Sequence, residues 1–480
     1  MLPIDSLKPQ RVFYYFKKIS AVPRGSGNMN GIARFCEDFA VEHGLKYVRD
    51  KSDNVVIYKE ASEGYENSEP VILQGHLDMV CQKTDECQID FKKDGIELYA
   101  DGDYVKARGT TLGADNGIAV AIILAILESD SIAHPPIEAV FTTDEEVGMI
   151  GARAFDTGVL KAKKMINLDS EEDGTVTVSC AGGSDFRVNI PLEFERKYGT
   201  KITLTLSGLQ GGHSGVEINK GRANADILAG RILNHLNGIC EFDIISVNGG
   251  DKSNAIPNSF TAELCVYNIN DFCGDAEKYF DVLKREICDR EKNFTAHISV
   301  QGDDYYSVLT DPLKSKIIFT LLCVPNGVMQ MSADIDGLVE TSLNLGVLKT
   351  ENNSVIMHFA LRSNKQSALM FLEERLSAFF KVQNVEYETF GHYPPWEYKE
   401  NSELRRIYEQ TYTELYGKVP KIEAIHAGLE CGVFASVIKD FDCIAIGPAL
   451  YDVHTVNEKL SISSTENLFN LIIKMLEKLN

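Results

Sequence analysis

Four short apolar runs in this chain of 480 residues are each followed closely by a histidine or a carboxylate. The runs are VILQG (71–75), IEAVFTT (137–143), KMINL (164–168) and DCIAI (442–446). Apolar runs of this length with turn residues behind them are typical of buried strands in a parallel sheet. Side chains that follow such strands gather at the carboxyl edge of the sheet, where α/β proteins bind ligands. The pattern therefore predicts an α/β fold, with a mixed or parallel sheet and a ligand site at that edge.

Five residues of metal-binding type stand at these strand ends or at the start of a helix. They are His76, Asp115, Glu146, Asp169 and His454. Asp115 precedes the apolar stretch NGIAVAIILAILES, so we expect it near a helix N-terminus, where an acid is locally favoured. Taken singly, Asp115 could be a helix cap and His454 a loop histidine. Together they predict two zinc ions per chain, because imidazole and carboxylate are both good zinc ligands; Co²⁺ or Mn²⁺ would accept the same residues.

The position of the fifth candidate predicts the domain organisation. His454 lies near the C-terminus, far along the sequence from the other four candidates. A closed site built from both ends of the chain requires a second domain inserted between its halves. A chain of this length is also too long for one ordinary domain. We therefore expect a discontinuous catalytic domain at 1–185 and 390–480, and an inserted lid domain at 186–389.

The predicted crossings between the domains have the composition of linkers. The first is the glycine-rich AGGSDF (181–186), and the second is FGHYPPWEY (390–398), where two prolines interrupt regular structure. The insert alternates strand-like and helical runs, which predicts an α+β lid with a sheet and helices on one face. The sequence of the insert shows no convincing internal repeat.

Six segments resemble the M20 family of di-zinc metallopeptidases and deacylases. They are GHLDMV (75–80), GTTLGADNGIAVA (109–121), FTTDEEVGMIGA (141–152), INLDSEE (166–172), LSGLQGGHSG (206–215) and HTVNEKL (454–460). Within that family the chain looks most like the aminoacyl-histidine dipeptidases, also called cytosolic non-specific dipeptidases. The resemblance extends from about residue 5 to the C-terminus. Some relatives have a lid about half as long as this insert, so the resemblance implies that the lid holds two related halves.

The resemblance implies a role for each candidate ligand. Asp115 would bridge both ions, His76 and Asp169 would complete one site, and Glu146 and His454 the other.

Two further acids receive roles from the same resemblance. Glu145 would be the general base that takes a proton from the attacking water and passes it to the leaving amine. Asp78 would orient the imidazole of His76, because a zinc-bound histidine usually donates its other N–H to a carboxylate. The resemblance also implies a cis peptide bond between Asp115 and Asn116.

Five residues of the insert and its surroundings would contact substrate. His213 in GLQGGHSG would contact the substrate carbonyl, Asn254 would face the substrate, and Arg362 in FALRS suits a carboxylate. Gly428 and Glu430 in HAGLECGVF would line the pocket. Without the resemblance, His213 could be a plain loop residue and Arg362 a surface arginine.

The ligand set and the resemblance together predict a cytoplasmic di-zinc dipeptidase that hydrolyses unmodified dipeptides. The resemblance alone implies that Xaa-His substrates of the β-alanyl-histidine kind are among them. The alternative within enzymes is an M20-type aminoacylase or amidase, which would use the same metal machinery. A non-catalytic binding module on the same scaffold is disfavoured by the intact ligand set and by Glu145.

Composition and net charge limit the classes of partner that this chain is expected to bind. A formal net charge of −22 argues against nucleic acid and anionic membranes. No apolar run is long enough to span a bilayer. The 11 cysteines include no C-x-x-C pair and do not indicate a disulfide framework. The sequence leaves both a monomer and a homodimer possible. Relatives often dimerise through the lid, whereas a double-sized lid could replace a partner subunit.

Overall fold

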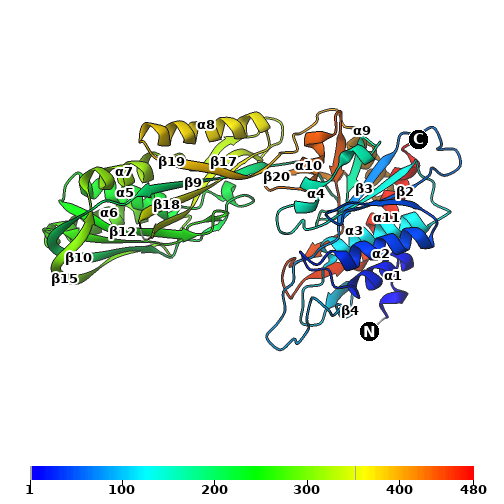
Figure 1. The fold of residues 1–480 in the computed structure, drawn as a ribbon, viewed down its shortest axis with the longest axis horizontal. Helices are drawn as coiled ribbons and strands as arrows, with labels where there is room; N and C mark the ends of the chain where they lie inside the picture. The colour runs from blue at the N-terminus through cyan, green and yellow to red at the C-terminus, as the bar shows by residue number, and fades with distance from the viewer. Residues whose placement is uncertain (1–2, 352) are drawn as a thin grey trace. The chain divides into compact units, whose positions relative to one another are not determined.

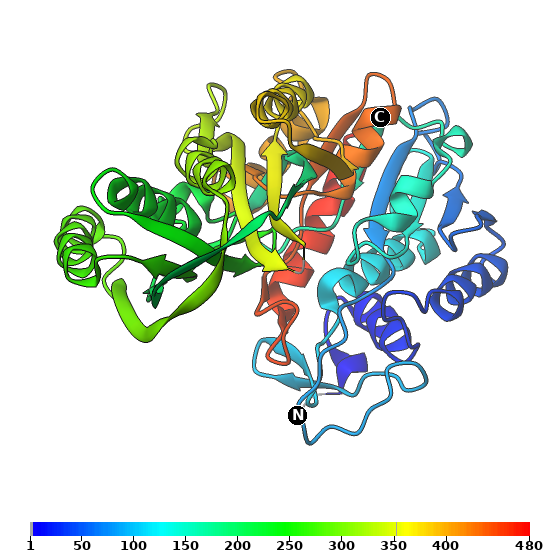
Figure 2. The ribbon, with the colours of Figure 1, turned by 60° about the vertical axis from the view of Figure 1, so that its left-hand side comes forward.

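The computed structural model describes residues 3–351 and 353–480, which divide into two compact units. The first unit is assembled from Met1–Cys180, Tyr398–Ala424 and Leu429–Asn480. The second comprises Ala181–Glu397 and Ile425–Gly428. The colours of Figures 1 and 2 show the same division, with both ends of the chain (blue to cyan, orange to red) in one body and its middle (green to yellow) in another.

The predicted domain boundaries lie close to the observed ones. The expected crossings at about 185 and 390 compare with changes of unit after Cys180 and after Glu397. A further, short excursion of Ile425–Gly428 into the second unit was not anticipated.

The first unit is built on an eight-stranded mixed sheet in the order β1-β2-β6-β3-β7-β21-β8-β20. Its centre consists of β6 (Ile137–Thr142), β3 (Val71–His76), β7 (Lys164–Asn167) and β21 (Asp442–Ala445), and neighbours in this set pair parallel. These are the four apolar runs of the sequence, and the prediction that they form central parallel strands is confirmed.

The other elements of the first unit surround this sheet (Figure 1). The outer strands are β1 (Lys46–Arg49), β2 (Val55–Lys59), β8 (Thr175–Cys180) and β20 (Lys421–Ile425). A four-stranded sheet in the order β22-β23-β5-β4 is formed by β4 (Leu98–Asp101), β5 (Tyr104–Ala107), β22 (Leu450–Tyr451) and β23 (Lys459–Ser461). The helices are α1 (Gln10–Ser20), α2 (Asn30–Glu42), α3 (Ala114–Glu128), α4 (Ile150–Ala154), α9 (Glu403–Tyr416), α10 (Glu430–Val437) and α11 (Ile462–Glu477), with short 3-10 helices η1 (Ile4–Ser6) and η2 (Thr157–Val159).

The second unit is built on a nine-stranded antiparallel sheet in the order β15-β10-β14-β12-β17-β18-β9-β19, with β16 paired to β17. The strands are β9 (Gly182–Pro191), β10 (Phe194–Ser207), β12 (Phe242–Asp251), β14 (Phe260–Val266), β15 (Thr295–Leu309), β16 (Gly327–Met331), β17 (Val339–Glu351), β18 (Ser354–Ser363) and β19 (Glu386–Tyr393). The helices are α5 (Ala225–Asn237), α6 (Ile269–Ile287), α7 (Asp311–Cys323) and α8 (Gln366–Val382). A small ladder pairs β11 (Gly212–His213) with β13 (Ala255–Ile256), and η3 covers Ile218–Lys220.

The nine-stranded sheet consists of two halves with the same topology. Along the chain, one half runs β10, α5, β12, β14, α6, β15, and the other runs β9, α7, β17, β18, α8, β19. In each half the first strand lies between the third and the fourth, and the second strand forms the inner edge. The halves join where β12 pairs antiparallel with β17. The suggested duplication is therefore present in the topology, although the sequence shows no repeat.

One face of this sheet is covered by helices and the other is not. Alternate residues of β18, namely Val355, Met357, Phe359 and Leu361, belong to one core together with buried residues of α5, α6, α7 and α8. Because successive side chains of a strand point to opposite faces, the residues between them point away from that core. The prediction of helices on one face is confirmed, and the opposite face is left for other contacts.

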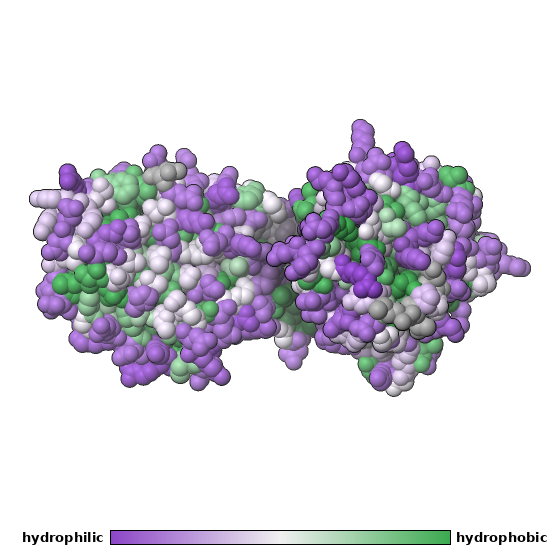
Figure 3. Space-filling view, turned by 90° about the horizontal axis from the view of Figure 1, so that it is seen from below, coloured by the Kyte–Doolittle hydropathy of each residue, from purple (hydrophilic) through white to green (hydrophobic). Residues whose placement is uncertain are grey.

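Three further features of the structure concern its cysteines, the length of its helices and the polarity of its surface. The 11 cysteines form no disulfide bond in the described structure. Among the described helices, none combines the length and the apolar character that crossing a bilayer requires. The surface in Figure 3 is mostly hydrophilic, with apolar residues in small patches.

Candidate metal centre and substrate-binding residues

His76 is held at the end of the central strand β3, with its side chain buried. Its Nε2 lies 3.0 Å from Oδ1 of Asp115 and 3.4 Å from Oδ1 of Asp169. Asp169 follows β7, the strand that pairs with β3, so parallel pairing brings both residues to the same edge of the sheet. Asp115 reaches this edge from the first turn of α3.

His454 approaches the same aspartate from the other side. Its Nε2 lies 3.1 Å from Oδ2 of Asp115 and 3.0 Å from Oε2 of Glu146. The two carboxylate oxygens of Asp115 thus face two different imidazoles, as a bridging ligand requires. Ligand atoms of His76, Asp115 and Glu146 all lie within 4.8 Å of one another. The structure therefore brings together all five candidates that lie far apart in the sequence.

The charges of these five side chains suit the binding of divalent cations. Burial raises the pKa of Glu146 and of Asp169, and neighbouring carboxylates add to the effect. Hydrogen bonds to Asp115 and Glu146 raise the pKa of His454 to about 10. Burial opposes ionisation of Asp115, yet hydrogen bonds from His454 and His76 lower its pKa. Buried carboxylates in this number require compensating positive charge, and two imidazoles with three carboxylates form a donor set that suits zinc.

Asp78 links the histidine loop to the segment that carries the two glutamates. Its Oδ1 lies 3.4 Å from Nδ1 of His76 and accepts a hydrogen bond of 2.9 Å from the backbone N–H of Glu145. Its Oδ2 accepts from the backbone N–H of Glu146 at 3.2 Å and from the Ser26 hydroxyl at 2.8 Å. One carboxylate thereby orients the imidazole of His76 and fixes the backbone beneath Glu145.

Glu145 has different surroundings from Glu146. Its neighbour Glu146 pairs with His454, whereas the pKa of Glu145 is raised well above its ordinary value by burial and by the charges of Asp169, Glu430 and Glu146. A carboxylate whose pKa lies above the usual range holds a proton more readily, which suits proton transfer near neutral pH.

The start of α3 is tied to the ends of two central strands. The peptide bond between Asp115 and Asn116 is cis, as predicted. The Asn116 side chain accepts a hydrogen bond from the backbone N–H of His76 at 3.2 Å and donates one to the Leu168 carbonyl at 2.9 Å. Asn116 therefore positions the bridging aspartate relative to β3 and β7.

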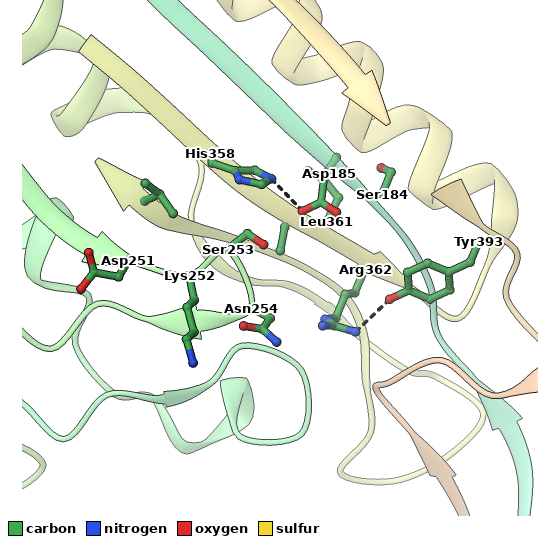
Figure 4. A pocket seen from close by; sticks show the side chains of 12 residues that line it. Ser184, Asp185, Asp251, Lys252, Ser253, Asn254, His358, Leu361, Arg362 and Tyr393 are labelled. Carbon is green, nitrogen blue, oxygen red and sulfur yellow. Dashed lines mark hydrogen bonds and ion pairs between the residues drawn. The ribbon is translucent and has the colours of Figure 1, made fainter. Parts of the chain in front are cut away.

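Arg362 and Asn254 line one cavity of about 480 Å³ in the second unit (Figure 4). Arg362 stands on β18, and its Nη1 donates a hydrogen bond of 2.8 Å to the hydroxyl of Tyr393 on β19. Asn254 lies in the turn between β12 and β13 and reaches the cavity from another side.

His213 is set up as a hydrogen-bond donor. Its Nδ1 accepts from the backbone N–H groups of Gly215 at 3.1 Å and Val216 at 3.2 Å. Burial, followed by the positive charge of Arg362, lowers the pKa of His213, so the ring is neutral at physiological pH. A neutral imidazole that accepts at Nδ1 carries its proton on Nε2. His213 and Arg362 are therefore close enough to interact electrostatically within the same unit.

Comparison with known proteins places the chain in a family. The sequence profile of peptidase family M20/M25/M40 matches residues 72–478. The cytosol non-specific dipeptidase of Escherichia coli (strain K12) is 37% identical over 483 residues, which cover 100% of this chain and 99% of that protein. This chain belongs to peptidase family M20.

Solved structures agree with the assignment to the M20 family. Aminoacylhistidine dipeptidase from Vibrio alginolyticus superposes with a TM-score of 0.94 at 36% identity, over 99% of this chain and 98% of that one. Aminopeptidase PepT from Bacillus cereus superposes with a TM-score of 0.57 at 14% identity, over 98% of this chain and 99% of that one. At that identity the second likeness concerns the fold alone.

Two of the expected substrate contacts of this M20 peptidase fall in different units. Gly428 belongs to the short excursion into the second unit, whose His426 contacts Ser342 on β17 at 2.7 Å. Glu430 begins α10 in the first unit and is fully buried. Its Oε2 accepts hydrogen bonds from Gln74 at 2.5 Å and Thr142 at 2.7 Å. The carboxylate of Glu430 is therefore held by two residues of the central strands, and its place beside the substrate stays a prediction.

Two buried charged residues beside the candidate metal centre, Arg24 and Glu458, were not predicted from the sequence. Arg24 donates from its guanidinium to the carbonyl oxygens of Asp78, at 3.1 Å, and of Gly113. Glu458 accepts from the backbone N–H groups of 112–114, at 2.8, 3.0 and 2.8 Å. Together they hold the loops that carry His76 and Asp115. Glu458 stands in the HTVNEKL segment, which offered a signal, whereas Arg24 lies in a loop without one.

Proposed function

We propose that this M20 peptidase is a di-zinc dipeptidase that hydrolyses unmodified dipeptides in the cytosol, Xaa-His among them. The names of the Escherichia coli and Vibrio relatives support the substrate class, and the cytosolic setting follows the Escherichia coli relative. The observation that carries the proposal is the cation Arg362, which lines a cavity together with Asn254 in the same unit as the neutral donor His213.

The first unit supplies the hydrolytic chemistry. Two zinc ions held by His76, Asp169, Asp115, Glu146 and His454 would lower the pKa of the attacking water and polarise the scissile carbonyl. Glu145 accepts the proton of that water and delivers it to the leaving amine. Asp78 keeps Glu145 in position through the backbone N–H that it binds at 2.9 Å.

The second unit supplies the substrate contacts. The Nε2–H of His213 donates to the oxyanion that develops from the scissile carbonyl. Arg362 binds the C-terminal carboxylate through charge-assisted hydrogen bonds. Because both groups belong to one unit, their separation is set within it.

An aminoacylase would use the same metals and the same carboxylate anchor, so the N-terminal side of the substrate decides between the two activities. The first unit concentrates buried carboxylates around the centre, among them Glu171, whose pKa burial and the charges of Asp115 and Asp169 raise to about 7. Such a field favours a free ammonium group over an acyl group.

The test is a matched set of substrates and one variant. Alanyl-histidine, its C-terminal amide and N-acetyl-histidine are compared with the metal-loaded protein, after chelation and after addition of zinc. We expect turnover of the free dipeptide to exceed that of the other two compounds by far, to be lost with the metal and to be restored by zinc. In Arg362→Ala the KM of the free dipeptide rises by about 30-fold or more, as expected for a lost charge-assisted contact of about 2 kcal/mol, and residual hydrolysis of the amide is unchanged. Preferential hydrolysis of N-acetyl-histidine would instead establish the aminoacylase.

A further inference from the structure

The cavity that contains Arg362 lies on the helix-free face of the nine-stranded sheet. His358, Ala360 and Arg362 alternate along β18 and all line it, because every second residue of a strand shares a face. Asp185 of β9 and Tyr393 of β19 line it from the two neighbouring strands. Three adjacent strands therefore form its floor (Figure 4).

The strand register explains how Arg362 is held. Across the sheet Arg362 pairs with Gly183, and Gly183 pairs with Tyr393. A Cβ on Gly183 would lie 2.4 Å from the Tyr393 hydroxyl, so only glycine lets this tyrosine cross over β9. The hydroxyl then meets Nη1 of Arg362 at 2.8 Å. Tyr393 thus positions the guanidinium over the floor of the cavity.

A second polar pair, Asp185 and His358, lies beside the row of Arg362, Gly183 and Tyr393. In the strand register Asp185 pairs with Ala360. This pair lies two positions along β9 and β18 from the Arg362–Gly183 pair. Oδ1 of Asp185 lies 2.8 Å from Nε2 of His358, which orients the carboxylate (Figure 4). The ring of His358 is packed against Phe390, with the ring centres 5.4 Å apart. An ionised carboxylate has several acceptor positions, so Asp185 can accept a further hydrogen bond from a ligand in the cavity.

The distance between the Arg362–Tyr393 pair and the Asp185–His358 pair matches the length of one substrate residue. Two positions along a strand correspond to about 7 Å. A substrate residue whose carboxylate meets Arg362 can therefore extend a long side chain towards Asp185. The other charged groups of the cavity, Asp251 and Lys252, follow β12 at a different side of it (Figure 4), and Asp251 is paired with Lys349 at 3.2 Å.

We propose that this cavity binds the C-terminal residue of the dipeptide and selects side chains that donate a hydrogen bond. Arg362, positioned by Tyr393, takes the carboxylate, and Asp185, positioned by His358, accepts from the side chain. The ligand class is an amino acid with a cationic or N–H-bearing side chain, such as lysine, arginine or histidine. This inference rests on the proposed dipeptidase activity and assigns its side-chain preference to specific residues.

The experiment compares two substrates that differ only at the side-chain terminus. Alanyl-lysine and alanyl-norleucine present an ammonium and a methyl group at nearly the same position. For the wild type we expect the kcat/KM of alanyl-lysine to exceed that of alanyl-norleucine at least tenfold. In Asp185→Asn that ratio falls about tenfold or more, because a charge-assisted hydrogen bond is lost. Alanyl-norleucine hydrolysis stays within about twofold, which shows that the variant is folded and keeps its metals.

Matched variants separate positioning from general damage. Asp251→Asn removes the other cavity carboxylate and leaves the ratio unchanged. His358→Gln lowers the ratio in the same direction as Asp185→Asn, because the carboxylate loses its orienting partner. Tyr393→Phe raises the KM of both substrates alike, leaves kcat unchanged and leaves the ratio intact.

The failures of the two proposals are distinguishable. If neither dipeptide is hydrolysed by the zinc-loaded wild type, the proposed function falls. If both are hydrolysed and Asp185→Asn leaves the ratio unchanged, the dipeptidase stands and this inference is overturned. Should Asp185→Asn be inactive on every substrate, product inhibition of the wild type decides: stronger inhibition by free lysine than by norleucine supports the pocket, and equal inhibition refutes it.

Discussion

Adjacent glutamates do different work at the end of β6. Glu146 lies 3.0 Å from His454 and is a candidate ligand, whereas the half-buried Glu145 lies among the charges of Asp169, Glu430 and Glu146 and is the proposed base. Neighbouring residues can diverge in this way because the backbone directs their side chains differently. The backbone N–H groups of both are anchored on Asp78, at 2.9 and 3.2 Å.

Substituting Glu145 with glutamine should separate base from ligand. We expect Glu145→Gln to lower turnover by about 10²–10⁴-fold, the usual contribution of a general base, while metal content stays unchanged. Steady-state kinetics with metal analysis of the purified variant checks this. Glu146→Gln is the matched control and should lose metal. Full activity in Glu145→Gln, or loss of its metal, would show that the roles of the two glutamates are misassigned.

His213 should contribute to the rate and not to the fold. Because its Nε2–H is the donor proposed for the oxyanion, His213→Ala should lower kcat by about 10²–10³-fold. Metal content should stay the same, since the ligands all lie in the other unit. The measurements are kcat, metal content and the thermal midpoint. A variant with the kcat of the wild type would make His213 a loop residue without a catalytic role.

At the scale of elements, helix α5 carries a buried acid that no ligand explains. Asp226 stands in its first turn, and neither carboxyl oxygen has a hydrogen-bond partner among the described residues. Burial raises the pKa of Asp226 well above its ordinary value. The folded carboxyl is therefore protonated at a pH where the unfolded chain, with a pKa of about 3.9, is ionised.

The sign of the pH dependence follows from this difference. Stability contributed by a group with a raised pKa is fully present below its unfolded pKa and is lost as pH rises through the folded value. Asp226→Asn cannot ionise, so its stability relative to the wild type should grow from about pH 4 upwards, by about 1.4 kcal/mol per pH unit. Urea unfolding at several pH values measures it. A difference independent of pH would contradict the prediction.

Asp243 provides the matched control on strand β12. Its carboxylate lies 3.2 Å from both Lys197 and Lys314. Asp243→Asn removes the charge that these lysines share and should therefore destabilise the unit. Opposite signs for the two substitutions would show that the buried environment, and not the residue type, decides the outcome.

At the scale of the whole molecule, all five candidate ligands belong to the first unit. Metal binds the folded state of that unit only, so it should stabilise it by mass action, by about 2.7 kcal/mol at 100 times the Kd. Chelation should accelerate hydrogen exchange in β3 and β7 and leave β14 and β18 unchanged. Hydrogen-exchange mass spectrometry resolves the two units in one experiment. An equal change in both would mean that the metals are not confined to the first unit.

The duplicated topology of the second unit also belongs to this scale. His213 follows β10 of one half, and Arg362 lies on β18 of the other, so the proposed substrate contacts draw on both halves. A single chain thereby contains two related sheets, joined where β12 pairs with β17. Whether two chains associate further stays a prediction that sedimentation can decide.

Local patterns in the sequence determined the central strands and the residues that follow them. The four apolar runs became β6, β3, β7 and β21 because a buried parallel strand needs a continuous apolar stretch, which is visible within a few residues. Four of the five candidate ligands were predictable for the same reason, since their place after a strand assigns them to one edge of the sheet, whereas Asp115 stands at the start of α3. The substrate residues came largely from resemblance, and their roles stay predictions.

Only the tertiary structure decided the contacts between distant segments. Arg24 and Glu458 stabilise the loops of the metal centre from opposite ends of the chain, and the row from Arg362 through Gly183 to Tyr393 depends on strand register. Polar pairs of this kind leave no periodic pattern, because each partner is an ordinary residue in its own segment. Their geometry exists only after long-range strand pairing has closed the intervening loops, so the sequence alone could not reveal them.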